Sequence, residues 1–298
     1  GSPTISHNVC VVPTTPSYAV GIGAAYGNAS ITDNRVQSPQ GGIETRLSGG
    51  LVARNFVQLV NQPYSQWTTF GVLSYDPTGL IVDANVVDTG NAMGYLGGNA
   101  GIGFATTGGA ATATVTSNTV RFGVGGGWPN PAFGIGDFLN SSSGTVTYSM
   151  MNNIVWGVPD AGGSQSYGVL LVSGSTFAAT ANLGLDNNDV FGCADGLVNY
   201  GASNGSGGTI AATAVDMNGL ANASANLSFA LPGTGSFVDD NSNWRLEPGA
   251  SVFGDFATVK HGGLVLSDAG GLDADGKPRP AGFTGSTGWS MGAYQQSY

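Results

Sequence analysis

An asparagine recurs eight times along this chain in one local frame, with an apolar residue three positions before it and another two positions after it. The eight asparagines are Asn8, Asn34, Asn55, Asn85, Asn118, Asn153, Asn188 and Asn218. Successive copies lie 21 to 35 residues apart. A loose period in this range is typical of a solenoid, in which similar coils stack on one another, rather than of one globular core.

The segments between these asparagines have the composition of short β-strands. They are rich in Val, Ile, Thr and aromatic residues, are bounded by Gly, Asn, Ser and Asp, and keep no helical period. Two or three short strands cannot bury a core alone, whereas parallel stacking of coils buries a continuous one. We therefore predict an all-β fold, a right-handed single-stranded parallel β-helix (solenoid) of about seven or eight coils over residues 1–230.

A solenoid explains why asparagine can occupy these positions, although burying an amide without partners costs a few kcal/mol. We expect each asparagine to lie at a corner between strands, near the left-handed conformation that Asn tolerates. Its amide would hydrogen-bond to the copies in the coils above and below. The repeated asparagines are therefore interpreted as a structural ladder, not as catalytic residues.

The first repeat begins almost at residue 1, because Ile5 already belongs to an asparagine frame. No room precedes it for a helix that would cover the exposed strand edges of a solenoid end. We therefore expect the chain to be a fragment or a processed product of a longer protein.

A glycine followed by an apolar residue alternates with the asparagine frame. The motif begins at Gly21, Gly42, Gly71, Gly101, Gly134, Gly168 and Gly196. If the apolar residue after each glycine points inward, the next residue and the third one point outward. A slip of one residue would invert this assignment.

Charge is sparse and acidic. Only 9% of the residues are charged, and the formal net charge is −10. Nucleic-acid binding requires basic patches, so we exclude it. No run of 18 apolar residues exists, and we expect no membrane span.

Residues 231–298 lack the repeat and carry different motifs, "SFVDDNSNWRLEPG", "DAGG", "DADGKPR" and "GAY". This end resembles secreted bacterial right-handed β-helix proteins of the pectin-lyase-like superfamily, including the group called choice-of-anchor Q domain proteins. The matching residues are Phe237, Asp239, Trp244–Leu246, Pro248, Gly249, Asp268–Gly270, Asp273, Asp275, Gly276, Pro278, Arg279 and Gly292–Tyr294. Ser290 and Gln295 depart from the acidic residues of the pattern. The resemblance implies the β-helix fold and an extracellular or cell-surface location, but it covers lyases, hydrolases, adhesins and proteins without known activity.

This C-terminal region is expected to cap the solenoid, with Trp244 and Leu246 over the last coil. Asp273 and Asp275 have the spacing of half a calcium loop. The other interpretation, which we prefer, is a plain Asp-Gly turn before a proline-rich loop. Calcium is the one cofactor that the sequence suggests.

Catalytic candidates gather where the outward positions of the glycine strands are ionisable, at Glu44, Arg46, Tyr75 and neighbouring Asp76. Glu44 and Asp76, one coil apart, would be the two carboxylates of a glycoside hydrolase. Tyr75 as base and Arg46 as neutraliser of a uronate carboxylate would suit a lyase. The alternative, which we favour, is a surface ion pair beside an exposed tyrosine.

The remaining outward positions form an apolar stripe, which we expect either to be covered by long loops of this chain or by another chain, or to stack against a glycan. Its members are Tyr75, Phe138, Leu170, Val172 and Tyr200. We predict a non-catalytic extracellular or cell-surface protein that assembles or binds glycans, its partner being an extracellular polysaccharide or another protein chain. The alternative is a polysaccharide lyase or glycoside hydrolase.

Overall fold

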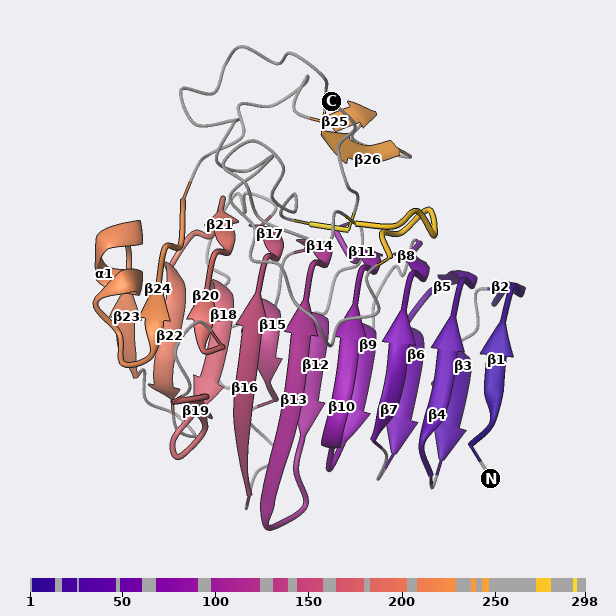
Figure 1. The fold of residues 1–298 in the computed structure, drawn as a ribbon, viewed down its shortest axis with the longest axis horizontal. Coiled ribbons are helices and arrows are strands. Elements are labelled where there is room, and N and C mark those ends of the chain that lie inside the picture. Colours follow the sequence, from indigo (N-terminus) through magenta and orange to yellow (C-terminus); the bar gives the residue numbers. More distant parts are fainter. Residues whose placement is uncertain are drawn as a thin grey trace.

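The chain folds into a parallel β-helix of three long sheets, which confirms the predicted fold class (Figure 1). The computed structural model describes residues 2–13, 18–25, 27–46, 49–60, 68–90, 98–123, 131–138, 144–157, 165–179, 183–202, 208–228, 237–239, 243–246, 272–279 and 292–293. Seven coils each contribute one strand to each sheet, and an eighth coil begins after them.

The three sheets are named here in the order in which the chain enters them. Sheet 1 contains β1 (Thr4–Ser6), β4 (Ala29–Thr32), β7 (Gly50–Ala53), β10 (Thr78–Asp83), β13 (Ala110–Thr116), β16 (Thr145–Met151), β20 (Leu185–Asp186) and β24 (Ala223–Ser224), with β19 (Thr176–Phe177) beside β16. Sheet 2 contains β2 (Val9–Val11), β5 (Arg35–Ser38), β8 (Phe56–Leu59), β11 (Val86–Asp88), β14 (Thr119–Phe122), β17 (Ile154–Gly157) and β21 (Asp189–Phe191). Sheet 3 contains β3 (Val20–Ala25), β6 (Gly41–Arg46), β9 (Thr69–Tyr75), β12 (Asn99–Ala105), β15 (Ala132–Asp137), β18 (Ser166–Val172), β22 (Gly196–Ala202) and the antiparallel β23 (Thr209–Ala211).

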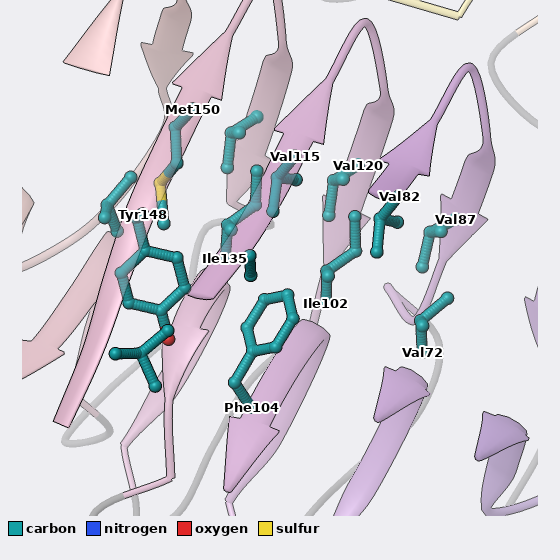
Figure 2. Packing of buried hydrophobic residues seen from close by; sticks show 14 of the residues in the cluster. Val72, Val82, Val87, Ile102, Phe104, Val115, Val120, Ile135, Tyr148 and Met150 are labelled. Atoms are coloured by element: carbon teal, nitrogen blue, oxygen red, sulfur yellow. The ribbon is translucent and has the colours of Figure 1, made fainter. Parts of the chain in front are cut away.

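The core is a column of apolar side chains in which each middle coil supplies one residue from each sheet. Val82, Val87 and Ile102 form one such layer, and each of them is at most 1% exposed. Figure 2 shows the next layers along the stack, with Phe104 and Tyr148 filling the wider part of the interior. The period-2 alternation of the strands puts these residues inside and leaves their neighbours outside.

The glycine of the glycine-apolar motif is required by the close approach of sheet 3 to sheet 2. At Gly101, a Cβ atom would lie 2.3 Å from Cγ1 of Val120 and 2.6 Å from the carbonyl oxygen of Gly134. The same conflict with a sheet 2 valine occurs at Gly21, Gly42, Gly71, Gly134 and Gly168. The motif therefore marks the corner at which sheet 3 begins.

The corner between sheets 1 and 2 is made by the residue before each ladder asparagine, not by the asparagine itself. His7, Asp33, Arg54, Ala84, Ser117, Asn152, Asn187 and Ala225 have φ between 52° and 59°. The sequence prediction placed this left-handed residue one position too late. The ladder asparagine is therefore the residue that follows the left-handed turn.

Closure of the last coil is achieved by α1 (Ala214–Asn218), a short helix capped by Thr213 and Asp216. Its Met217 is fully buried in the main core, beneath the end of the stack. The expected C-terminal cap lies elsewhere in its described residues: Gly292 N donates to Asn152 O and Ala293 N to Thr119 Oγ1, at the turns of the middle coils. The hairpin of β25 (Phe237–Asp239) and β26 (Asn243–Leu246) belongs to the same region, but the side chains of Trp244 and Leu246 lie outside the described residues.

Candidate functional site

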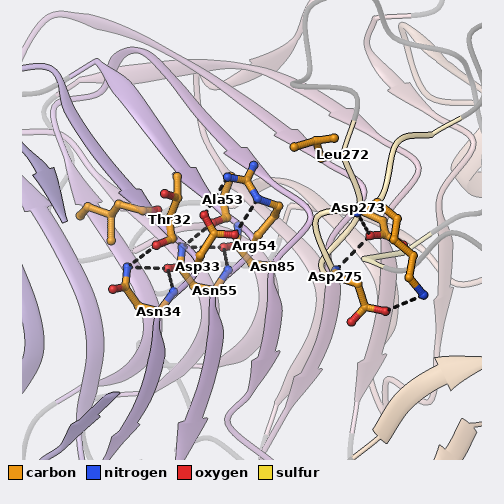
Figure 3. A network of polar contacts seen from close by, with 12 residues as sticks. Thr32, Asp33, Asn34, Ala53, Arg54, Asn55, Asn85, Leu272, Asp273 and Asp275 are labelled. Atoms are coloured by element: carbon orange, nitrogen blue, oxygen red, sulfur yellow. Dashed lines mark hydrogen bonds and ion pairs between the residues drawn. The ribbon is translucent and has the colours of Figure 1, made fainter. Parts of the chain in front are cut away.

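The asparagine ladder is a column of amides that are buried from Asn34 onward, and Figure 3 shows Asn34, Asn55 and Asn85 of this column. At Asn55, Nδ2 donates to Oδ1 of Asn85 at 3.0 Å and to the carbonyl oxygen of Ile31 in the preceding coil at 2.9 Å. The backbone N–H of Asn55 donates to the same Oδ1 of Asn85 at 3.0 Å. This pattern repeats along Asn34, Asn55, Asn85, Asn118, Asn153 and Asn188, and Asn8 donates into its exposed end. Because the amide atoms are committed to each other, the ladder offers no group for catalysis.

The eighth corner asparagine is Asn226, and the assignment of Asn218 to that corner is wrong. Nδ2 of Asn188 donates to Oδ1 of Asn226. Nδ2 of Asn226 in turn donates to Oδ1 of Asn218 at 2.9 Å. Asn218 lies on α1 and ends the ladder from outside the coil. Asn226 was missed because Ala223 and Ser228 replace the larger apolar residues of the frame.

The outward row of sheet 3 is fixed by the strand register, and it corrects the last strand of the predicted set. Paired residues run through Gly23, Glu44, Leu73, Gly103, Gly136, Leu170 and Asn199. Val198 pairs with Val169 and is buried in the main core, where Tyr200 also packs, with its ring 5.9 Å from that of Phe177. In β22 the first inward residue is the second one after the glycine of the glycine-apolar motif, whereas in the other strands it is the first. Tyr200 therefore points inward and does not belong to the outer stripe.

The apolar residues on the outer face of sheet 3 are buried. Leu73, Phe133, Tyr167, Leu170 and Val172 form a second apolar cluster, and each is at most 4% exposed. Tyr75 and Phe138 pack against its border, and Phe138 lies edge-on to Phe133. Leu170 and Val172 are therefore buried within the chain itself, which is one of the three predicted outcomes, and they do not form an open stacking surface.

The ionisable cluster on this face lies in its N-terminal coils, where Glu44 is held from two sides. Nε of Arg46 donates to Glu44 Oε1 at 2.5 Å, and the hydroxyl of Tyr18 donates to Oε2. Glu44 is only 7% exposed, so both carboxylate oxygens are used where little water reaches them. Tyr18 was missed by sequence reasoning because it precedes β3 and belongs to no repeat.

The aromatic ring of Tyr75 packs against the guanidinium of Arg46. The Arg46 guanidinium lies 4.7 Å above the centre of the Tyr75 ring, and its side chain is 51% exposed. The hydrogen bond that Arg46 donates to Glu44 raises the pKa of Arg46, which stays charged. Burial, and to a smaller extent the charge of Glu44, raise the pKa of Tyr75. The pKa of Tyr18 is raised by burial, by its hydrogen bond to Glu44 and by the charge of Glu44. Both phenols are therefore protonated at neutral pH.

Asp76 does not join this cluster. Its two carboxylate oxygens accept from the backbone N–H and the hydroxyl of Thr107 in the next coil, both at 2.7 Å. The register pairs Glu44 with Leu73, so Asp76 lies three residues further along the adjacent strand, about 10 Å away in that direction. The pair of carboxylates that a glycoside hydrolase needs is not brought together here.

The arrangement of Tyr18, Glu44, Arg46 and Tyr75 suits binding better than proton transfer. A general base needs a free, deprotonated group within reach of its proton, whereas Glu44 is occupied and Tyr75 is protonated. Arg46, in contrast, presents the outer edge of a planar guanidinium on an aromatic ring. Such a platform can donate hydrogen bonds to a ligand without reacting with it.

Asp273 and Asp275 form the turn that was the preferred interpretation (Figure 3). Oδ1 of Asp273 accepts from the backbone N–H of Asp275 at 2.9 Å and of Lys277 at 2.8 Å, and Asp275 pairs with Lys277 at 3.4 Å. Two backbone N–H groups thus occupy Oδ1 of Asp273 and Lys277 pairs with Asp275, at carboxylates that a calcium ion would need as ligands. Nearby Arg279 donates to the carbonyl oxygens of Gly292 and Ala293, which ties the two described pieces of this region together.

Comparison of the chain with protein-family models, with curated proteins and with solved structures finds no match. Across the described ranges, no helix is long and apolar enough to cross a membrane.

Proposed function

We propose that this protein is a non-catalytic β-helix module, acting outside the cell or on its surface, that binds glycans at the Arg46–Tyr75 platform. The observation that carries the proposal is the guanidinium of Arg46, half-exposed, stacked on Tyr75 and fixed in place by Glu44. A rigid cation on an aromatic ring offers a sugar both stacking and donor groups. The extracellular setting is supported by the resemblance of the C-terminal motifs to secreted β-helix proteins and by the low content of charged residues, 9%.

Binding should be measured by calorimetry with soluble neutral and acidic polysaccharides. Arg46→Ala and Tyr75→Ala should each weaken the association at least tenfold, because each removes half of the platform. Arg35→Ala is the matched control, since Arg35 lies 4.7 Å above the ring of Phe56 on sheet 2 in the same stacked geometry. Equal loss in the control, or no binding to any polysaccharide, would contradict the proposal.

The alternative is a polysaccharide lyase or hydrolase that uses Glu44, Arg46, Tyr75 and Asp76. It is favoured only by the resemblance to a superfamily that contains such enzymes. Under this alternative, incubation with polysaccharides releases unsaturated or new reducing ends, and Glu44→Gln abolishes the release. We expect no release from wild-type protein because Glu44 and Asp76 are both occupied.

A further inference from the structure

The outer face of sheet 1 carries a regular array of hydroxyl groups in the middle coils, where its strands run side by side (Figure 1). One row of the array is in register across β10, β13, β16 and β19, and its members, all exposed, are Thr78, Thr112, Thr147 and Thr176. The other outward hydroxyls of β13 and β16 belong to Thr114, Thr145 and Ser149. The array therefore extends both across the strands and along them.

Strand geometry fixes the spacing of these hydroxyls. Neighbouring strands lie about 4.8 Å apart, and alternate residues of one strand lie about 6.6 Å apart. The β-branched side chain of threonine has a restricted χ1, so its hydroxyl and methyl groups keep defined directions. Oγ1 of Thr112 accepts a hydrogen bond from the backbone N–H of Gly79 at 2.9 Å, whereas the other six side chains make none within the described residues. The array therefore leaves most of its donors and acceptors for a ligand.

Strand propensity does not explain the array, because it favours threonine in every strand of the solenoid. The parallel strands of sheets 2 and 3 carry no exposed threonine among the described residues. Their outer faces carry cations on aromatic rings instead, such as Arg35 on Phe56 and Arg46 on Tyr75. The exposed and half-buried positions of β10, β13, β16 and β19 hold neither charged nor aromatic side chains. This face is thus neutral, and its hydroxyls alternate with methyl groups.

A neutral lattice of hydroxyl groups complements the surface of ice. A threonine hydroxyl both donates and accepts hydrogen bonds, as a water molecule does. Water oxygens on a prism face of hexagonal ice repeat in two perpendicular directions at distances similar to the two spacings of the array. A crystalline polysaccharide is also a regular neutral surface, but sugar rings stack on aromatic side chains, which this face lacks at its exposed and half-buried positions. The chemistry of the face therefore favours ice over a glycan.

We propose that the outer face of sheet 1 binds ice, with the threonine hydroxyls of β10, β13, β16 and β19 bonded to the outermost layer of water molecules. The stacked coils hold the array in place before binding, so that little conformational entropy is lost when the face meets a crystal. This inference does not depend on glycan binding, because Arg46 and Tyr75 lie on sheet 3.

The freezing and melting temperatures of single ice crystals in solutions of the whole chain test the proposal. Wild-type protein should hold the freezing temperature below the melting temperature and give the crystals facets, because ice cannot grow through bound protein. Thr112→Lys with Thr147→Lys should lose most of this temperature gap, since two long charged side chains keep the face away from the crystal. Thr147→Lys alone should lose part of it, and replacing this exposed residue breaks no hydrogen bond within the described residues.

Thr209→Lys, at an exposed threonine of β23 in sheet 3, is the matched control and should keep the wild-type gap, as should Arg46→Ala. Circular dichroism confirms that each variant is folded. Wild-type protein without a gap would overturn the proposal, and so would an equal loss in Thr209→Lys. If wild-type protein instead sediments with crystalline cellulose or chitin, shows no gap, and loses that binding in the double lysine variant, the array is a polysaccharide surface and the proposal is wrong.

Discussion

Asp137 shows how a single charged residue is accommodated inside the apolar column. It points inward from β15 and is 3% exposed. The hydroxyl of Tyr148 donates to its Oδ1, and the backbone N–H of Val172 donates to its Oδ2 at 3.1 Å. Desolvation by burial outweighs these hydrogen bonds and raises the pKa of Asp137 to about 6. The native state therefore prefers the protonated carboxyl.

Stability should consequently fall as the pH rises through this range. Below about pH 4 the carboxyl is protonated in both the unfolded and the native states and contributes no difference. Above about pH 6 the native state holds a buried charge, which lowers the free energy of unfolding by ~3 kcal/mol. Urea unfolding of Asp137→Asn at pH 4 and pH 7 should show a smaller loss of stability between the two pH values than wild type, because the amide carries no charge that burial penalises. Burial also raises the pKa values of Asp83 and Asp88, so the free energy of unfolding of Asp137→Asn should still fall with rising pH, but less steeply than in wild type. Equal slopes in wild type and Asp137→Asn would show that Asp137 is not the source.

Individual ladder residues were predictable where the frame is strong and not where it is weak. Seven corner asparagines follow from their apolar neighbours, whereas Asn226 sits between Ala223 and Ser228 and gives no apolar signal. The candidate site was predicted in part: Glu44, Arg46 and Tyr75 do contact one another. Tyr18 could not be found, because its contact with Glu44 depends on the path of the chain before β3 and not on any period.

The strands of sheet 3 show what the glycine motif signifies at the scale of an element. Glycine is needed where the strand starts against the valine of sheet 2, and inward alternation follows from that point. In β22 the equivalent position is occupied by Leu197 rather than by Gly196, since Gly196 pairs with Tyr167. A one-residue change of this kind keeps the glycine-apolar pattern but exchanges the two faces, which explains the wrong assignment of Tyr200.

Gly101→Ala tests the steric origin of the motif. The new Cβ would meet Val120 and the backbone of Gly134 in the middle of the stack, and overpacking of this kind costs about 1–3 kcal/mol. Gly23→Ala is the matched control on another strand of the same sheet, because nothing lies within 4 Å of a Cβ there. Thermal unfolding should show a clear decrease for Gly101→Ala and little change for Gly23→Ala. If both variants melt at the wild-type temperature, close approach is not the reason for the glycine.

At the scale of the whole molecule, the stacked architecture was predictable because each coil repeats the same physical solution. Apolar residues of one coil lie on those of the next: in sheet 1 the strand pairing runs through Ile31, Val52, Val82, Val115 and Met150, with one register shift between Thr78 and Leu80 of β10. Burial of Leu170 and Val172 on the outer face of sheet 3 was one of three predicted outcomes, and the sequence could not choose among them because that burial does not arise from the repeat itself. The position of the described C-terminal residues beside the middle coils was unforeseen for the same reason.

The asparagine ladder connects these coils along the length of the molecule, so an interruption in its middle should be far more costly than one at its start. Asn118→Leu removes the acceptor of the backbone N–H and of one Nδ2 hydrogen of Asn85, and it takes one donor each from the carbonyl oxygen of Val82 and from Oδ1 of Asn153, all in a buried site. Unsatisfied buried groups cost about 1–3 kcal/mol each, and we expect a total loss of ~3 kcal/mol or more. Asn8→Leu removes the same side chain where water can replace it, and should cost less than about 1 kcal/mol.

Urea unfolding measures the two losses, and hydrogen exchange locates them. Since each coil contacts only its neighbours, Asn118→Leu should reduce amide protection mainly in β10 to β17, on both sides of the break. Asn8→Leu should leave those strands as protected as in wild type. Similar losses of stability in the two variants would contradict this prediction. They would show that burial of the amide does not determine how much a ladder asparagine contributes to stability.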